Sequence, residues 1–339
     1  MNDTTELIAK PNEHPFAPYV RILGKGKTGS RSLTRPEAKT AMGMILRGEV
    51  KEVQLGAFLM LLRVKEESPD ELAGFVEAAR ETIAAPRDIH ADLDWSSYAG
   101  KRRQLPWFLL SALALADSGV RVFMHGAGGH TIGRLYTESV LNALGIASAE
   151  SWRDVAAQLD TGRFAFLPLR HLCPPLQAMI DLRNEFGLRS PVHTLVRLLN
   201  PLAANYSAQS IFHPAYALHH QRAAADLGQP HACVFKGEGG EIERKPEATC
   251  RVLSVHDGML SEETWSKLTE GRQEQPAELD IESLRRVWRG EADDGYAELA
   301  IEGTLAIALR LLGRADNPAQ ATALAAACWQ ARDRARIAR

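Results

Sequence analysis

Apolar residues recur at helical spacing between residues 31 and 86, where the chain predicts three short amphipathic helices. The first is expected to begin after Thr34, because Glu37 stands three residues later, in the spacing of a capping box. The second holds the apolar positions from 53 to 64, and the third begins at Ser68. We therefore expect residues 31–86 to form a small all-helical domain.

From residue 87 onward, short apolar runs bounded by turn residues alternate with helical stretches. Residues 105–116 predict a buried helix, and residues 119–124, 164–167 and 233–235 predict strands. Strands that alternate with helices favour a mostly parallel sheet. The predicted fold class is α/β, with a small all-helical N-terminal domain and a larger α/β domain over residues 87–339.

The first 30 residues contain three prolines and several lysines, and they predict a loose basic arm over residues 1–30. Residues 24–29, GKGKTG, superficially resemble a P-loop, but Ser30 stands where that motif needs its lysine and no strand precedes the stretch. Cations outnumber acids around it: Arg21, Lys25, Lys27, Arg31, Arg35 and Lys39 face only Glu37. Both a flexible anion-binding arm and a plain solvated loop fit this pattern.

Charge is segregated along the chain, whose formal net charge is only −2. Residues 257–302 hold thirteen acidic and five basic residues, a net charge of −8, which leaves about +6 on the rest. Any anion-binding role must therefore come from local patches. The four cysteines lack C-x-x-C spacing, and no apolar run approaches the roughly 20 residues that span a bilayer. We expect a cytoplasmic protein with no membrane partner.

Three consecutive cations, Lys101, Arg102 and Arg103, directly precede the apolar helix predicted from residue 105. Cations at a helix N-terminus oppose the helix macrodipole unless an anion arrives. The pattern therefore predicts a bound phosphate, although a nearby acidic side chain would serve equally. Trp107 could stack on a base, or it could belong to the core.

A glycine-rich loop follows the strand predicted at 119–124 and could hold a phosphate on its backbone N–H groups. A simple strand-to-helix turn explains the same loop. Arg134 would strengthen the anion interpretation if it points the same way, and Arg197 is a further candidate. The histidines at 213, 219 and 220 lack the partner spacing of a zinc site, so no metal site is predicted.

Residues 31–81 resemble the N-terminal helical domain of the anthranilate phosphoribosyltransferases, through L-T-x-x-E-A, G-E-V, Q-x-G-A-F-L-M and L-R-V-K elements. Further similar stretches follow in the same order: GVRVFMHG (119–126), VLNALGI (140–146) and LRNEFGLRSPVHTLVRLLNP (182–201). The resemblance implies this family's fold, known as the glycosyltransferase family 3 fold. It also implies that helices from about 174–200 join the helical domain in space, and that a homodimer forms through that domain.

The departures from this family concern its phosphate and metal motifs. Its G-T-G-G-D-G loop is replaced by SSYAGKRRQ, and its N-x-S-T by residues 106–109, PWFL. The metal-binding D-E falls near residues 240–243, where at best one acidic position survives in register. Of the family's site residues only His125, Gly126 and Arg183 match, which makes them vestigial catalytic candidates.

Three further stretches are G-K-G-K near residue 24, HLCPP (171–175) and S-x-x-H-T-L (190–195). In these the chain looks more similar to a paralogous group, the YbiB-like proteins, which keep this fold and are regarded as nucleic-acid binders without the phosphoribosyltransferase activity. The resemblance therefore implies binding of DNA or RNA with weak sequence specificity and without a cofactor. The proposed contacts are Lys25, Lys27, Arg31, Lys101, Arg102, Arg103, Arg134 and Arg197. Two alternatives stay open: a phosphoribosyltransferase with an altered substrate, which would use Mg²⁺, and a scaffold that binds a protein.

Overall fold

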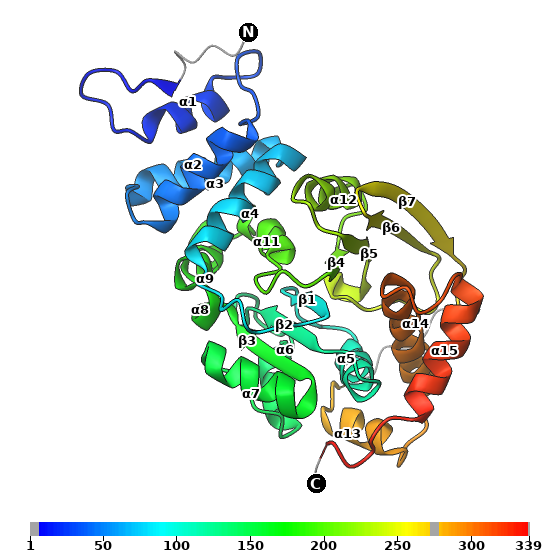
Figure 1. The fold of residues 1–339 in the computed structure, drawn as a ribbon. Coiled ribbons are helices and arrows are strands. Elements are labelled where there is room, and N and C mark those ends of the chain that lie inside the picture. Colours follow the sequence, from blue (N-terminus) through cyan, green and yellow to red (C-terminus); the bar gives the residue numbers. More distant parts are fainter. Residues whose placement is uncertain (1–6, 272–277, 338–339) are drawn as a thin grey trace.

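The computed structural model describes residues 7–271 and 278–337, and it divides them into a helical unit and an α/β unit (Figure 1). No helix in these two ranges is long and apolar enough to cross a membrane. The helical unit contains α1 (Ala17–Gly24), α2 (Arg35–Leu46), α3 (Glu52–Lys65) and α4 (Pro69–Thr82). The predicted helices correspond to α2, α3 and α4.

Capping boxes fix the starts of α2 and α4, as the sequence predicts. The Thr34 side chain accepts a hydrogen bond from the Glu37 backbone N–H, while the Glu37 carboxylate accepts from the Thr34 N–H. Ser68 and Glu71 repeat this exchange at α4. Both exchanges satisfy backbone donors that would otherwise have no partner at a helix start.

The loose arm predicted for residues 1–30 is wrong over α1, while residues 1–6 lie outside the described residues. Pro18 occupies the first turn of α1, where the missing N–H of proline costs nothing. Tyr19, Ile22 and Leu23 are at most 7% exposed and belong to the core of the helical unit. The prolines therefore begin a packed helix here.

The α/β unit is built around a seven-stranded sheet in the order β3-β2-β1-β4-β5-β6-β7. Neighbouring strands from β3 through β5 are parallel, and β6 and β7 are antiparallel, so the predicted mostly parallel sheet is confirmed. The strands are β1 (Leu93–Ser97), β2 (Val122–Gly126), β3 (Phe164–Pro168), β4 (Tyr206–Ile211), β5 (His231–Lys236), β6 (Cys250–His256) and β7 (Met259–Trp265).

Helices cover both faces of the sheet (Figure 1). On one face, the buried helix α5 (Phe108–Asp117) packs with α14 (Gly295–Leu311) and α15 (Pro318–Gln330), and α13 (Glu282–Arg289) adds to the same core. The other helices are α6 (Thr137–Ala143), α7 (Trp152–Gly162), α8 (Leu169–Leu172), α9 (Pro174–Asp181), α10 (Arg183–Phe186), α11 (Val192–Leu195) and α12 (Tyr216–Asp226). Two single 3-10 turns, η2 (Val196–Leu198) and η3 (Glu238–Gly240), complete the described elements.

Side chains alternate between two cores along the central strands. In β3, Phe164 and Phe166 join the core of α5 and α14, while Ala165 and Leu167 join the core shared with the helical unit. This period of two is that of a strand buried on both faces. Because α9, α11 and α12 contribute to the second core together with α2–α4, the helical unit packs directly on the α/β unit.

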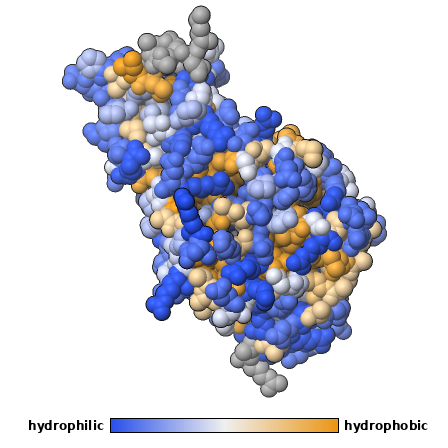
Figure 2. All heavy atoms as spheres, viewed as in Figure 1, coloured by the Kyte–Doolittle hydropathy of each residue, from blue (hydrophilic) through white to orange (hydrophobic). Residues whose placement is uncertain are grey.

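The surface seen in Figure 2 is mostly hydrophilic, with apolar residues gathered in patches on the α/β unit. On the helical unit, α3 leaves Val53 and Val64 strongly exposed. The homodimer through this unit, which the resemblance implies, stays a prediction.

Candidate anion-binding site

The candidate site lies at the carboxyl-terminal edge of the parallel strands. The crossover from β1 runs to β2 on one side, whereas β4 continues to β5 on the other, so the strand order reverses between β1 and β4. In open α/β sheets, ligands bind outside the carboxyl ends of the strands at such a point. The loops that follow β1, β4 and β5 meet there.

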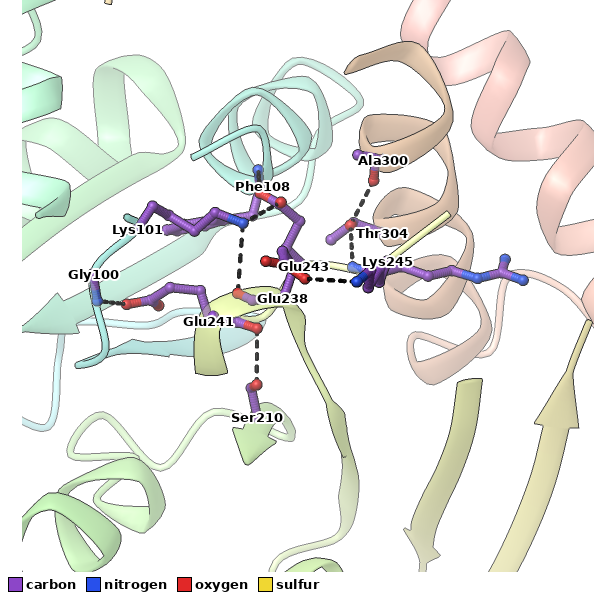
Figure 3. Close-up of polar contacts among 12 residues, drawn as sticks. Gly100, Lys101, Phe108, Ser210, Glu238, Glu241, Glu243, Lys245, Ala300 and Thr304 are labelled. Carbon is purple, nitrogen blue, oxygen red and sulfur yellow. Dashed lines mark hydrogen bonds and ion pairs between the residues drawn. The ribbon is translucent and has the colours of Figure 1, made fainter. Parts of the chain in front are cut away.

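Glu241, in the loop after β5, is buried against the loop after β1. Its Oε1 accepts hydrogen bonds from the backbone N–H groups of Ala99 at 2.7 Å and Gly100 at 2.6 Å (Figure 3). Its Oε2 accepts from Ser97 Oγ at 2.9 Å. Gly100 has φ of +68°, which lets the two successive N–H groups converge on one carboxylate. This pair of N–H groups therefore already holds an anion that the chain itself supplies.

Glu243, two residues further on, places its carboxylate at the N-terminus of α5. Its Oε2 accepts the Phe108 backbone N–H at 2.9 Å, and its Oε1 forms an ion pair with Lys101 Nζ at 2.5 Å (Figure 3). Burial raises the pKa of Glu243, while Lys101 opposes that change. The anion at the start of α5 is therefore the carboxylate of Glu243. Of the two possibilities named from the sequence, a bound phosphate and a nearby acidic side chain, the second holds for Lys101.

Lys101 is therefore not a phosphate contact, contrary to the prediction. Its side chain is 1% exposed and is held between Glu243 and the carbonyl oxygen of Glu238. Arg197 is likewise misassigned. It is 6% exposed and donates to the carbonyl oxygens of Ser210 and Gly240 at 2.9 and 2.8 Å.

The two carboxylates do not fit a magnesium ion. Mg²⁺ prefers carboxylate and water oxygens in octahedral geometry, with oxygens free to coordinate it. All four carboxylate oxygens of Glu241 and Glu243 already accept hydrogen bonds or an ion pair. No group of three or more His, Cys, Asp or Glu side chains within the described ranges could hold a metal ion.

Outside this closed network lies a cleft of about 590 Å³ whose walls are rich in cations. Arg102 and Arg103 are exposed at its rim, and they form no ion pair or hydrogen bond with the described part of the chain. Arg134 donates to the carbonyl oxygens of Ala99 and Gly100, and it pairs with no carboxylate of residues 7–271 or 278–337. Three of the cations in the lining, Lys101, Lys245 and Arg251, form ion pairs with carboxylates. The other cations of the lining are Arg102, Arg103, Arg134 and Lys236, and Glu238 is the acid that lines the cleft with them.

The N-terminal cations do not line this cleft. Lys25 and Lys27 follow α1, which lies at the end of the helical unit remote from the sheet (Figure 1). Arg31 forms a bidentate pair with Glu37, with hydrogen bonds of 2.7 and 2.8 Å. The structure therefore brings together only Arg102, Arg103 and Arg134 of the predicted surface contacts.

Of the vestigial candidates, His125 and Gly126 are buried in β2, and Arg183 is partly exposed. His125, in β2, is fully buried, with its Nδ1 2.6 Å from the Tyr98 hydroxyl and its Nε2 3.2 Å from Asp94. A Cβ on Gly126 would lie 2.1 Å from the carbonyl oxygen of Ser97, so glycine is required for the spacing of β1 and β2. Arg183 donates to the His130 carbonyl oxygen.

Two cleft residues, Lys236 and Phe212, were not identified from the sequence, and they lie at or just after the end of a strand at this edge. Lys236 is the last residue of β5, and Phe212, immediately after β4, exposes 51% of its side-chain surface inside the cleft. Lys236 could have been found from the sequence, because a lysine directly after the strand predicted at 233–235 must lie at the edge of the sheet. Identifying Phe212 would have required the position of β4, a strand that was not predicted from the sequence.

A helical bundle packed on an α/β unit, with its polar site at the strand edge, is the architecture of a two-domain glycosyl transferase. The chain belongs to the glycosyl transferase family. The family's helical bundle domain matches residues 18–83, and its α/β domain matches residues 108–331.

The relatives of the chain include anthranilate phosphoribosyltransferases and a YbiB protein. The Escherichia coli (strain K12) protein "Uncharacterized protein YbiB" is 30% identical over 247 residues, which cover 71% of this chain and 76% of that protein. The anthranilate phosphoribosyltransferase of Myxococcus xanthus is 30% identical over 285 residues, covering 82% and 80%. The resemblance to both groups that the sequence analysis stated is confirmed.

Solved structures share the fold. Anthranilate phosphoribosyltransferase from Thermus thermophilus aligns with a TM-score of 0.74 at 23% identity, covering 92% of this chain and 94% of that one. The Saccharomyces cerevisiae enzyme in complex with PRPP and Mg aligns with a TM-score of 0.76 at 16% identity, covering 95% of each.

Proposed function

We propose that the protein binds nucleic acid, DNA or RNA, through the cationic cleft and without strong sequence specificity. The observation that carries this proposal is the set of cleft cations without a carboxylate partner among the described residues: Arg102, Arg103, Arg134 and Lys236. Such cations neutralise phosphates and release counterions, which supplies affinity that does not depend on sequence. Exposed Phe212 adds an aromatic face on which an unpaired base can stack.

The segregation of charge supports this role. Much of the negative charge of residues 257–302 is paired locally where the chain is described, as in the ion pairs Glu262–Arg251, Glu263–Arg310 and Glu282–Arg285. One cleft cation, Arg251, is itself paired with this segment through Glu262. Among the described residues, no carboxylate of the segment pairs with Arg102, Arg103, Arg134 or Lys236, so these four cations can act on a ligand.

The test is a salt titration of binding to single-stranded and duplex DNA and RNA, comparing wild type with the double variant R102A/R103A. Two lost phosphate contacts are expected to reduce the slope of log affinity against log salt by about 1.4 for single strands and about 1.8 for duplex DNA. Arg153→Ala, an exposed cation on α7 remote from the cleft, is the charge control and should leave the slope unchanged. An unchanged slope in R102A/R103A would exclude the cleft, and absence of binding would exclude the function.

Pentosyl transfer is the alternative function, favoured by membership of the glycosyl transferase family and by the match of His125, Gly126 and Arg183. The closed network around Glu241 and Glu243 counts against it, because it occupies the donors and carboxylates that a diphosphate and Mg²⁺ would need. Binding of phosphoribosyl pyrophosphate that requires Mg²⁺, measured by calorimetry beside the nucleic-acid titration, would promote this alternative.

A further inference from the structure

A second cavity adjoins the cationic cleft, and the two share Ile211 and Phe212 in their walls. It has a volume of about 130 Å³, which admits a small polyatomic group but no base pair. It lies where the helical unit meets the α/β unit, since Arg63 comes from α3 while the remaining walls come from residues 189–197 and 211–220. Of the contacts proposed for the cleft, Phe212 alone also lines this second cavity.

Guanidinium groups surround the cavity without carboxylate partners. Arg63 is exposed at its mouth, and neither Arg63 nor Arg189 forms an ion pair with any described residue. In the described part of the chain, the one hydrogen bond of Arg189 goes to the Ala99 carbonyl oxygen, at 3.5 Å. Arg134 of the cleft donates to the same oxygen at 3.0 Å. Burial and the neighbouring arginines lower the pKa of Arg189 to about 10. Like charges gathered in this way favour a bound anion.

Two buried polar side chains in the cavity wall have no partner for one of their atoms. Ser190 is 4% exposed and His193 is 6% exposed. Within the described ranges, the Ser190 hydroxyl and His193 Nε2 have no hydrogen-bond partner. The Nδ1 of His193 lies 3.2 Å from the Ser190 carbonyl oxygen, so in the neutral ring Nδ1 carries the hydrogen and Nε2 is an acceptor. Buried groups of this kind are normally satisfied, and a ligand would satisfy both.

From these contacts we propose that the second cavity binds a phosphate monoester. Guanidinium groups match phosphate oxygens in a bidentate manner, and the Ser190 hydroxyl adds a further donor. A monoester has its second pKa near 6, so it can present an O–H to His193 Nε2, whereas an internal phosphodiester has no proton to give. The inference rests on the proposed function for one source of the monoester, the phosphorylated end of a strand in the cleft. The other source is a free phosphate compound such as a nucleoside monophosphate.

Glu67, which follows α3, acts electrostatically on Tyr216, one of the residues that line the cavity. Burial raises the pKa of Glu67 to about 7, so near neutral pH this carboxyl carries only part of a negative charge. It therefore opposes a bound phosphate less than an exposed glutamate would.

The test compares binding of a short single strand carrying a 5′-phosphate, a 3′-phosphate or only hydroxyl ends. Wild type is expected to bind one phosphorylated end at least about tenfold more tightly than the hydroxyl-ended strand, since a terminal phosphate adds charge and two or more charge-assisted hydrogen bonds. Arg63→Ala and Ser190→Ala should abolish this preference. Lys236→Ala, in the cleft only, should weaken all three strands equally and keep it, and Arg153→Ala should change nothing.

Inorganic phosphate and adenosine monophosphate, titrated by calorimetry into wild type and Arg63→Ala, test the free source. Binding that Arg63→Ala abolishes, without an end preference, supports a free monoester as occupant. Equal affinity for all strand ends together with no binding of either free compound overturns the proposal while leaving cleft binding intact. Preference or binding that survives both Arg63→Ala and Ser190→Ala also overturns it, because the site would lie elsewhere.

Discussion

The carboxylates at the inner strand edge and the cations of the outer cleft use charge in opposite ways. Glu241 and Glu243 are at most 1% exposed, and each of their oxygens has a partner within the chain. Arg102 and Arg103, next in sequence to Lys101, are exposed and have no partner in the described chain. Of the three consecutive cations, Lys101 thus belongs to the inner network, and Arg102 and Arg103 belong to the cleft.

The difference separates charge that stabilises the fold from charge available to a ligand. A buried ion is costly unless it is paired and hydrogen-bonded, so the inner carboxylates and Lys101 depend on one another. An exposed cation near no acid costs little and keeps its capacity to bind an anion. The variants below test this separation.

The largest effect is expected from breaking the buried pair on one side only. Glu243→Leu leaves Lys101 charged and unpaired in the core and also removes the partner of the Phe108 N–H. We expect a loss of about 3–5 kcal/mol in unfolding free energy, measured by urea denaturation. Adding Lys101→Met to this variant should recover much of the loss, because the unpaired charge disappears. If the unfolding free energy of Glu243→Leu lay within about 1 kcal/mol of the wild-type value, the ion pair between Lys101 and Glu243 would not be shielded from solvent.

Glu67 also has a buried carboxyl, but no lysine of the described chain forms an ion pair with it as Lys101 does with Glu243. The contribution of Glu67 to the unfolding free energy should therefore depend on pH. Burial raises its pKa to about 7 from the ordinary 4.5, so the folded state holds a proton that the unfolded state releases. Stability therefore falls as pH rises from about 4.5 to 7, and the loss amounts to about 3 kcal/mol above that range. Glu67→Gln should escape this loss, being more stable than wild type at pH 8 and similar to it near pH 4. Parallel stability curves of the two proteins over this range would contradict the assignment.

Much of the fold was predictable because its signals are local. The capping boxes at Thr34 and Ser68 specify helix starts through contacts within four residues. The apolar runs at β3 and β5 stand out for the same reason. β1 was not predicted, because LDWSS contains three polar residues whose burial depends on distant partners, such as Glu241 for Ser97. α1 was missed because prolines suited to a first turn were interpreted as breaks in the chain.

The site was only partly predictable, because its decisive contacts join residues far apart in sequence. Lys101 and Glu243 are separated by 142 positions, and no local pattern distinguishes Lys101 from the two arginines that follow it. Arg197 is buried by carbonyl oxygens from β4 and from the loop after β5, which only the folded chain brings together. Residue type indicated anion binding, but exposure decided which cations remain available for it.

A smaller effect is expected at Phe212, the aromatic residue of the cleft. If unpaired bases stack on its half-exposed ring, Phe212→Ala should weaken single-strand binding by about 1–3 kcal/mol. Duplex binding should change little, since paired bases already stack on one another. Phe212→Tyr keeps an aromatic face and serves as the matched control. Equal losses for duplex and single strand would indicate that Phe212 only shapes the cleft.

The smallest effect on stability should come from replacing the exposed cleft cations, because they do not belong to the buried network around Glu241 and Glu243. Arg102 and Arg103 contact no described partner, so R102A/R103A should alter the unfolding free energy by no more than about 0.5 kcal/mol, as surface substitutions usually do. The same double variant should nevertheless lose about tenfold or more in nucleic-acid affinity near 0.1 M salt, because two phosphate contacts disappear. Urea denaturation and binding titrations on one preparation measure both quantities. A stability loss comparable to that of Glu243→Leu would place these arginines in the fold and remove them from the ligand surface.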